Sequence, residues 1–383
     1  MKNIPYNKQY IDKTDIAEVK KSLASDIIAA GPTVAKFEKN LSKAVDCKYT
    51  VVCNSGTSAL HLAFLSIDLK KNDVVIMPIV NFIAAYNMCK NLGVKVFFAD
   101  VNELTGQMEE KDVLNCINQY KLKKIKLILI MHLAGHILQS EKLYRLKKKL
   151  NCYLIEDACH ALGSSYKVRD KKIKIGSCKH SDIAVFSFHA LKTITTGEGG
   201  AICTNSKRFF NKSKLFRSHG MIRKSFTKYD ITLNGFNFRL PDINASLGIS
   251  QLKKLGKFVN NRRKIAKNYY RLMNKLVSSN YLSLPNINFL NLSAWHLFVI
   301  NLNFKKIKKK KKDFINFMRE KNILIQNHYI PINKFSTEKK FYLFKNAENY
   351  YKSSASIPIY VNLSLDKQKY IVNNIERFVK KND

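Results

Sequence analysis

The sequence has little acidic charge, no long hydrophobic run and no closely spaced pair of cysteines. No apolar run reaches the roughly 18 residues that a membrane-spanning helix needs. The first ten residues are polar and lack the apolar stretch of a secretory signal. We therefore expect a cytoplasmic protein with no membrane partner.

The eight cysteines form no C-x-x-C pair, and several lie inside apolar runs. A disulfide framework or a zinc site would need paired or regularly spaced cysteines. The pattern instead indicates buried thiols in a reducing compartment, and we expect no metal.

Acidic residues number 28 against 67 Lys and Arg, which gives a net charge of +39. Such a charge is typical of proteins that bind nucleic acid or an anionic surface. The excess is spread along the chain, however, and no zinc-finger, RRM or helix-turn-helix pattern accompanies it. The one dense run, residues 305–312, is predicted to be a solvated loop or helix face. We therefore expect no nucleic-acid partner, although the field would attract an anionic small substrate.

What the sequence does contain is a globular α/β pattern. Its 383 residues are 46% apolar, too apolar for a disordered chain and enough for two packed domains. Short β-rich runs alternate with helical stretches, which predicts an α/β doubly wound sheet. The predicted strands are residues 49–53, 74–77, 94–99, 125–131, 153–155, 183–188 and 200–204.

From residue 241 the pattern changes, and a smaller α+β domain is predicted. A long amphipathic helix at 241–275 is followed by a strand at 295–302, a helix near 313–321 and a final helix from Ser364. We place the large domain at residues 1–250 and the small domain at 251–383. Open parallel sheets bind ligands beyond the carboxyl ends of their strands, so chemistry is expected just after each run.

The first predicted strand is followed by Asn54-Ser55-Gly56-Thr57-Ser58 and then by a helix. Free N–H groups at a helix N-terminus form a natural anion site. Such residues also serve simply as a helix cap, and on this segment alone the cap is the more economical interpretation.

The fifth strand leads into Glu156-Asp157, and the sixth into a small-residue loop that contains Lys192. A strand-end carboxylate that is buried needs a cationic partner, although Asp157 would also serve as the N-cap of a following helix. A desolvated Lys has a lowered pKa, and its neutral amine is a nucleophile. An ordinary exposed lysine is the alternative for Lys192. Together, an anion cradle, an acid and a buried Lys are what pyridoxal phosphate requires.

At this point the sequence resembles the DegT/StrS family of sugar aminotransferases, which are fold-type-I pyridoxal phosphate enzymes. The matching segments occur in the family's order over nearly the whole chain: residues 31–32, 37–38, 54–60, 81–84, 156–158, 187–192, 197–200, 217–220 and 237–240. The resemblance implies a central, mostly parallel seven-stranded sheet with a smaller C-terminal α+β domain. It also implies a homodimer with shared active sites.

The resemblance further implies roles for individual residues. Lys192 would bind the cofactor aldehyde and move protons, and Asp157 would pair with the pyridine nitrogen. The other cofactor contacts would be Gly56, Thr57, Phe82, His160 and Ser187, with Asn237 reaching the phosphate from the second subunit. The nucleotide-sugar pocket would contain Tyr6, Asp26, Ile27, Ile28, Ala29, Gln326, Asn327, His328 and Tyr329.

Four stretches are most similar to the branch of this family that acts in pseudaminic acid biosynthesis: residues 189–200, 215–221, 237–240 with 246–248, and 328–332. This similarity implies transfer of an amino group from glutamate to carbon 4 of a UDP-linked 4-keto-6-deoxy-N-acetyl sugar. Amination of another nucleotide-linked keto-sugar is the alternative within the class. A basic protein that binds nucleic acid or an anionic surface is the alternative from another class.

Overall fold

A seven-stranded sheet forms the centre of the molecule in a computed structural model, which describes residues 3–225, 227–338 and 343–380. The strand order is β1-β9-β8-β5-β4-β2-β3, and only β9 runs antiparallel to its neighbours. The strands are β1 (Tyr49–Cys53), β2 (Val74–Pro78), β3 (Lys95–Ala99), β4 (Leu127–Met131), β5 (Tyr153–Asp157), β8 (Ile183–Ser187) and β9 (Gly200–Thr204). All seven predicted strands are therefore confirmed, as is the mostly parallel α/β sheet.

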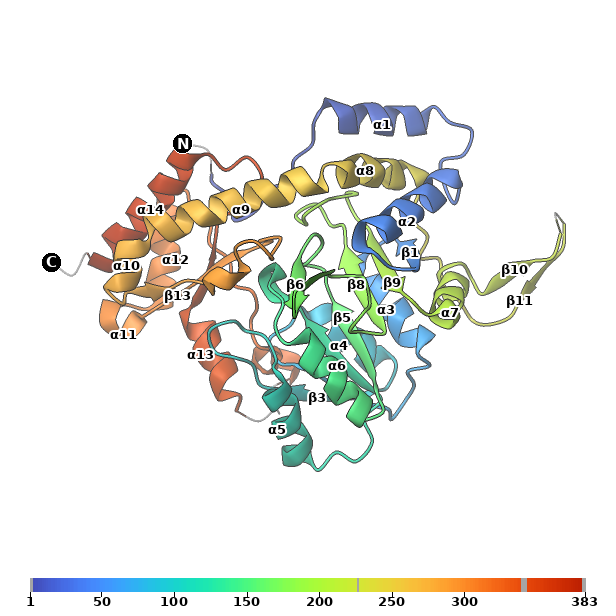
Figure 1. The fold of residues 1–383 in the computed structure, drawn as a ribbon, viewed down its shortest axis with the longest axis horizontal. Helices are drawn as coiled ribbons and strands as arrows, with labels where there is room; N and C mark the ends of the chain where they lie inside the picture. Colours follow the sequence, from blue (N-terminus) through green and yellow to red (C-terminus); the bar gives the residue numbers. More distant parts are fainter. Residues whose placement is uncertain (1–2, 226, 339–342, 381–383) are drawn as a thin grey trace.

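Helices cover both faces of this sheet (Figure 1). Leu127 and Leu129 of β4 pack into a core with α3 and α4, whereas Ile128 and Ile130 pack into another core with α5 and α6. A third core lies under α2 and α8. Burial on both faces explains the continuous apolar runs. These helices are α2 (Pro32–Val45), α3 (Gly56–Ser66), α4 (Ile83–Asn91), α5 (Glu110–Tyr120), α6 (Ser140–Lys149), α7 (Lys207–Arg217) and α8 (Asp242–Lys253).

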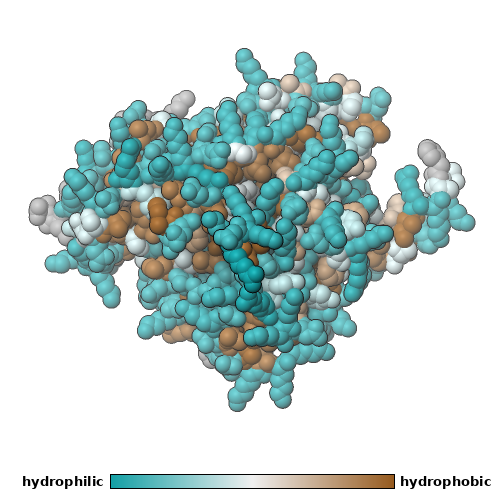
Figure 2. All heavy atoms as spheres, viewed as in Figure 1, coloured by the Kyte–Doolittle hydropathy of each residue, from teal (hydrophilic) through white to brown (hydrophobic). Residues whose placement is uncertain are grey.

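Two hairpins that the sequence pattern did not predict are inserted into the large domain. One is β6 (Ser165–Val168) with β7 (Lys171–Lys174), and the other is β10 (Met221–Arg223) with β11 (Tyr229–Ile231). The second hairpin extends away from the body of the molecule at the right of Figure 1 and, in the same view, of Figure 2.

The C-terminal part is the predicted smaller α+β unit, with its own core around α9 and an antiparallel sheet in the order β12-β13-β14. The long helix predicted at 241–275 is wrong in one respect, because it is divided at Lys254 and Met273 into three helices. The elements are α9 (Leu255–Leu272), α10 (Asn274–Ser278), β12 (Leu282–Ser283), β13 (Phe298–Leu302), α11 (Phe304–Ile307), α12 (Lys311–Glu320), α13 (Lys345–Ser353), β14 (Ser354–Ile357) and α14 (Leu365–Lys380). Short 3-10 turns lie at Leu133–Gly135, Ile287–Phe289, Ile332–Lys334 and Ser336–Glu338.

The N-terminal segment joins the two parts. Ile4 pairs with Ile323 of the C-terminal part, and α1 (Lys13–Leu23) lies along α8 (Figure 1). The boundary at residue 250 stays a prediction, and packing changes gradually along α9, with Phe258 in the core under α2 and Ile265 in the C-terminal core. Among the described residues, no helix is both long and apolar enough to span a bilayer.

Candidate active site

A cavity of about 570 Å³ lies beyond the carboxyl ends of β1, β2, β4, β5 and β8. This is the position at which open parallel sheets bind ligands. It brings together the anion cradle, the acid and the amine that the sequence singled out. The predicted site residues that line it are Tyr6, Gly56, Thr57, Phe82, Asp157, His160, Ser187, Lys192, Gln326, Asn327, His328 and Tyr329.

The anion cradle is the start of α3. Ser55 caps the helix, since its hydroxyl oxygen accepts from the Ser58 N–H at 3.0 Å. The N–H groups of the first turn have no partner within the helix and favour an anion. A Cβ at Gly56 would lie 2.8 Å from the Cβ of Ser187, so only glycine permits this close approach. The capping role predicted as the alternative thus belongs to Ser55, while Gly56 and Thr57 line the cavity.

Asp157 is the last residue of β5, two residues beyond the predicted end of that strand. Its side chain is buried, with only 3% of the residue exposed, and one carboxylate oxygen accepts from the Cys159 N–H at 3.1 Å. The alternative that Asp157 caps a following helix is wrong, because no helix lies within residues 158–206, all of which the structure describes. A buried carboxylate on a cavity wall requires a cationic partner.

Lys192 lies in the ordered loop between β8 and β9. Its N–H donates to the His189 carbonyl at 2.9 Å, and the Thr196 N–H donates to the Phe188 carbonyl at 3.0 Å. Burial lowers the pKa of the Lys192 amine below its ordinary value, and the charge of Asp157 acts in the opposite direction. Partial desolvation therefore raises the neutral, nucleophilic fraction of this amine.

Part of the cavity wall is aromatic. Phe82 is 51% exposed although it lines the cavity, and its ring centroid is 5.7 Å from that of Tyr329. An exposed aromatic face in a concave site is suited to cover a flat ligand ring. Together with the anion cradle and the acid, it fits pyridoxal phosphate.

His160 and His328 complete this wall. Burial holds the pKa of His160 well below its usual range, with the charge of Lys192 as the second cause. Burial likewise lowers the pKa of His328 to about 3, and its Nδ1 lies 2.8 Å from the Ser356 hydroxyl. Both imidazoles are therefore neutral at ordinary pH.

Five predicted site residues lie outside this cavity in the single chain. Asp26, Ile27, Ile28 and Ala29 are exposed, and Ala29 forms an isolated bridge with Pro241. Asn237 is exposed beside Ser218. Their predicted roles in the site therefore require contacts that the single chain does not provide.

Asn81, for which the resemblance implies a place in or near the substrate pocket, also lines the cavity. It is 1% exposed, and neither atom of its amide has a hydrogen-bond partner among the described residues. In the sequence it stands in the matching segment 81–84, directly before Phe82.

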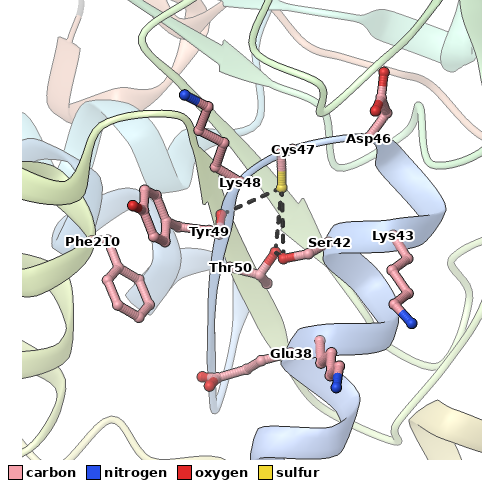
Figure 3. A pocket seen from close by; sticks show the side chains of 10 residues that line it. Glu38, Ser42, Lys43, Asp46, Cys47, Lys48, Tyr49, Thr50 and Phe210 are labelled. Carbon is pink, nitrogen blue, oxygen red and sulfur yellow. Dashed lines mark hydrogen bonds between the residues drawn. The ribbon is translucent and has the colours of Figure 1, made fainter.

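A second cavity, of about 630 Å³, lies between α2 and the start of β1 (Figure 3). It is lined by Glu38, Lys43, Cys47 and neighbouring residues, and the Cys47 sulfur lies 3.5 Å from the Thr50 hydroxyl and 3.3 Å from the Tyr49 carbonyl. None of the predicted site residues lines it. The slightly smaller cavity at the strand ends is therefore the better candidate.

The chain matches the DegT/DnrJ/EryC1/StrS aminotransferase family over residues 9–376. A Campylobacter jejuni protein named UDP-4-amino-4,6-dideoxy-N-acetyl-beta-L-altrosamine transaminase is 35% identical over 385 residues, which cover 99% of this chain and 98% of that protein. A Helicobacter pylori protein of the same name is 32% identical over 381 residues, with 98% and 97% covered.

Solved structures agree with this match. The chain superposes on Helicobacter pylori PseC, described as an aminotransferase involved in the biosynthesis of pseudoaminic acid, with a TM-score of 0.90 and 31% identity. The superposition covers 99% of this chain and 100% of that one. The Streptococcus pneumoniae protein Spr1654 in its PLP form superposes with a TM-score of 0.88 at 24% identity, covering 99% of each chain, and supports the fold.

Proposed function

This chain belongs to the DegT/DnrJ/EryC1/StrS aminotransferase family, and on that premise we propose that it moves an amino group from glutamate to carbon 4 of a UDP-linked 4-keto-6-deoxy-N-acetyl sugar. The product would be UDP-4-amino-4,6-dideoxy-N-acetyl-altrosamine, on the route to pseudaminic acid. The family resemblance in the sequence is confirmed, and so is an enzyme that depends on pyridoxal phosphate.

The observation that carries the proposal is the convergence of Lys192, Asp157 and the α3 N-terminus on one cavity. Pyridoxal phosphate supplies an aldehyde and a ring that acts as an electron sink. Gly56, Thr57 and Ser187 would hold its phosphate, Asp157 its pyridine nitrogen and Phe82 its ring face. His160 would lie near its phenolic oxygen.

Lys192 would perform the proton transfers, since burial already lowers the pKa of its amine toward the working pH. Tyr6 and the segment 326–329 line the same cavity and would bind the sugar nucleotide. The large positive charge of the chain would raise the local concentration of that dianionic substrate.

The proposed substrate is tested by giving purified protein glutamate, the cofactor and a panel of nucleotide-linked keto-sugars, with mass analysis of the products. The expected result is a 4-amino product from the UDP-linked 4-keto sugar and release of 2-oxoglutarate. Amination at carbon 3, or preference for another nucleotide, would contradict the proposed substrate. The yellow colour of the loaded protein should be lost in Lys192→Ala and kept in Lys179→Ala, which changes an exposed lysine.

We also propose a homodimer that shares its active sites. Hairpin β10-β11 extends from the body (Figure 1), and Ile222, Tyr229 and Ile231 on it are 42%, 62% and 50% exposed. A second copy would cover these side chains and bring Asn237 to the phosphate cradle. A cytoplasmic location is proposed because all eight cysteines are unpaired thiols.

Complementation tests the shared site. Lys192→Ala and Asn237→Ala should each be nearly inactive alone. If Asn237 acts across the interface, coexpression of the two variants should restore about a quarter of the sites. About half of the dimers would then contain one copy of each variant, and each of these mixed dimers would have one intact site out of two. No recovery would place Asn237 in the site of its own chain or outside both.

A further inference from the structure

Arg262 of α9 is a buried cation, with 1% of the residue exposed. Its Nη1 donates to the carbonyls of Ile359 at 3.0 Å, Trp295 at 3.2 Å and His296 at 3.3 Å. Its Nη2 donates to the amide oxygen of Asn7 at 2.9 Å. These oxygen partners replace the water that the guanidinium loses on burial, so displacing any of them is costly.

Asn7 connects this cation to the loop that holds the reactive lysine. Its Nδ2 donates to the Leu191 carbonyl at 2.9 Å, and Leu191 directly precedes Lys192. The same Nδ2 also donates to the His296 carbonyl, at the longer distance of 3.4 Å. Asn7 is 3% exposed, and its Oδ1 also accepts from the Lys8 N–H at 2.9 Å. Arginine only donates and a carbonyl only accepts, so the orientation of the Asn7 amide is fixed.

The same contacts join three chain segments beside the cavity. The Ile359 N–H donates to the Tyr6 carbonyl at 2.9 Å, next to Asn7. The His296 ring centroid is 4.2 Å from that of His160. The Arg262 and Asn7 side chains therefore hold together the chain segments that carry Tyr6, Lys192 and the histidine beside His160.

We propose that Asn7 is a positioning residue, which Arg262 holds so that its amide fixes the Leu191 carbonyl and thereby aims the Lys192 amine at the cofactor aldehyde. In that step the amine nitrogen attacks the aldehyde carbon, a C–N double bond replaces the C–O double bond, and the oxygen leaves as water with both protons of the neutral amine. The inference rests on the role of Lys192 given above.

Asn7→Asp separates the contact of Asn7 with Arg262 from the contacts of its Nδ2 with the Leu191 and His296 carbonyls. The new carboxylate keeps the size of the side chain and still accepts from Arg262, with which it forms an ion pair. An oxygen would, however, replace the donor that faces the Leu191 carbonyl, and two acceptors repel each other. Asn7→Ala loses all of these contacts.

Gln251→Ala is the matched control. Gln251 is 1% exposed, and its Nε2 donates to the Tyr10 carbonyl at 2.9 Å and to Asp15 at 2.8 Å. It therefore also holds the N-terminal segment by a buried amide, but at a point away from Leu191.

The experiment compares the dissociation constants of the cofactor-free protein for pyridoxal phosphate and pyridoxamine phosphate. The two compounds share the phosphate and the ring, and only the first carries the aldehyde that Lys192 captures. Asn7→Asp and Asn7→Ala should weaken pyridoxal phosphate binding at least about ten-fold, which is the size expected for one lost buried hydrogen bond, and should change pyridoxamine phosphate binding less than about two-fold. Lys192→Ala should give the same pattern, and Gln251→Ala should leave the ratio of the two constants unchanged.

Equal weakening of both compounds in Asn7→Asp, or no weakening of either, would overturn the positioning role. Thermal unfolding of Asn7→Asp confirms that the variant is folded when the ratio is read. A wild-type protein that takes up neither compound would overturn the proposed function and this inference with it.

Discussion

The phenolic oxygen of Tyr329 lies 3.0 Å from Nε2 of His160, and both side chains line the cavity that contains Lys192. Burial raises the pKa of Tyr329 well above its usual value and holds that of His160 well below its own. The hydroxyl therefore keeps its proton and the imidazole stays neutral across the ordinary pH range. This hydrogen bond fixes the ring of His160 without adding a charge to the site.

Tyr329→Phe removes that hydrogen bond and leaves a buried imidazole nitrogen without a partner. We expect kcat to fall about ten-fold, because loss of a buried hydrogen bond of this kind costs about 1–3 kcal/mol. The shape of the pH profile should not change, since neither group titrates near neutrality. Tyr370→Phe is the control, because its hydroxyl donates to the Lys321 carbonyl in the C-terminal part. A new ionisation in the profile of Tyr329→Phe would contradict this account.

Gly56→Ala should separate cofactor binding from folding. The added Cβ would meet Ser187 at 2.8 Å, so Ser187 or the first turn of α3 must shift and the anion cradle must widen. We expect cofactor affinity to fall about ten-fold or more, measured by titration of the cofactor-free protein. Gly256→Ala is the control, since nothing lies within 4 Å of its added Cβ, and it should leave affinity unchanged and stabilise α9 by about 0.5–1 kcal/mol. Equal affinities for the two variants would show that the cradle does not bind the phosphate.

The sheet and the central site groups could be predicted because they depend on local patterns. A strand buried on both faces is a continuous apolar run, and Lys192 stands in a small-residue loop between two such runs. Hairpin β6-β7 has no such apolar run, because three of the four residues of β7 are lysines: Lys171, Lys172 and Lys174. Contacts between distant residues also leave no local pattern: Asn7 and Arg262 are 255 positions apart.

The lysine run at 305–312 also makes contacts with distant residues that its local pattern does not predict. Most of it is exposed, as predicted. Three of its lysines nevertheless donate to carbonyls at or near the C-terminal ends of other helices: Lys306 to Ser279, Lys309 to Phe378 and Lys311 to Tyr351. Cations at these ends complement the helix dipoles. Composition predicted the exposure of the run but not this structural use.

Asn81 is predicted to bind a ligand at a cost to the stability of the free protein. Its buried amide has no partner among the described residues, and such a group destabilises a fold by about 1–3 kcal/mol unless a ligand or water pairs with it. Asn81→Ala should therefore leave the unfolding temperature of the free protein unchanged or raise it, while binding of cofactor or nucleotide sugar weakens. A lower unfolding temperature together with unchanged binding would show a purely structural role.

Lys192→Met should stabilise the cofactor-free protein at neutral pH. The pKa of Lys192 is lowered by folding, so between that lowered value and 10.5 the unfolded chain binds the extra proton and stability rises with pH. Each unit of lowering corresponds to about 1.4 kcal/mol that the protonated lysine costs below its native pKa. The stability difference between variant and wild type should thus shrink as pH approaches 10.5, as measured by urea unfolding. A constant difference would mean that Lys192 is not desolvated.

Acid should destabilise the free protein, because its buried histidines bind protons less readily than those of the unfolded chain. Burial lowers the pKa of His136 to about 3, and that of His160, His296 and His328 in the same direction. Below about 6.5 the unfolded chain binds protons that the native chain does not, so stability falls with falling pH by up to about 2 kcal/mol per histidine at pH 5.

His136→Phe isolates one of these histidines. The ring of His136 stacks on Phe289 with centroids 4.5 Å apart, and neither ring nitrogen has a partner among the described residues, so a phenyl ring can replace it. Urea unfolding between pH 5 and 8 should show a shallower loss of stability for the variant, with the largest gain over wild type at pH 5. Parallel curves for the two proteins would mean that His136 binds its proton in the native state as readily as in the unfolded chain.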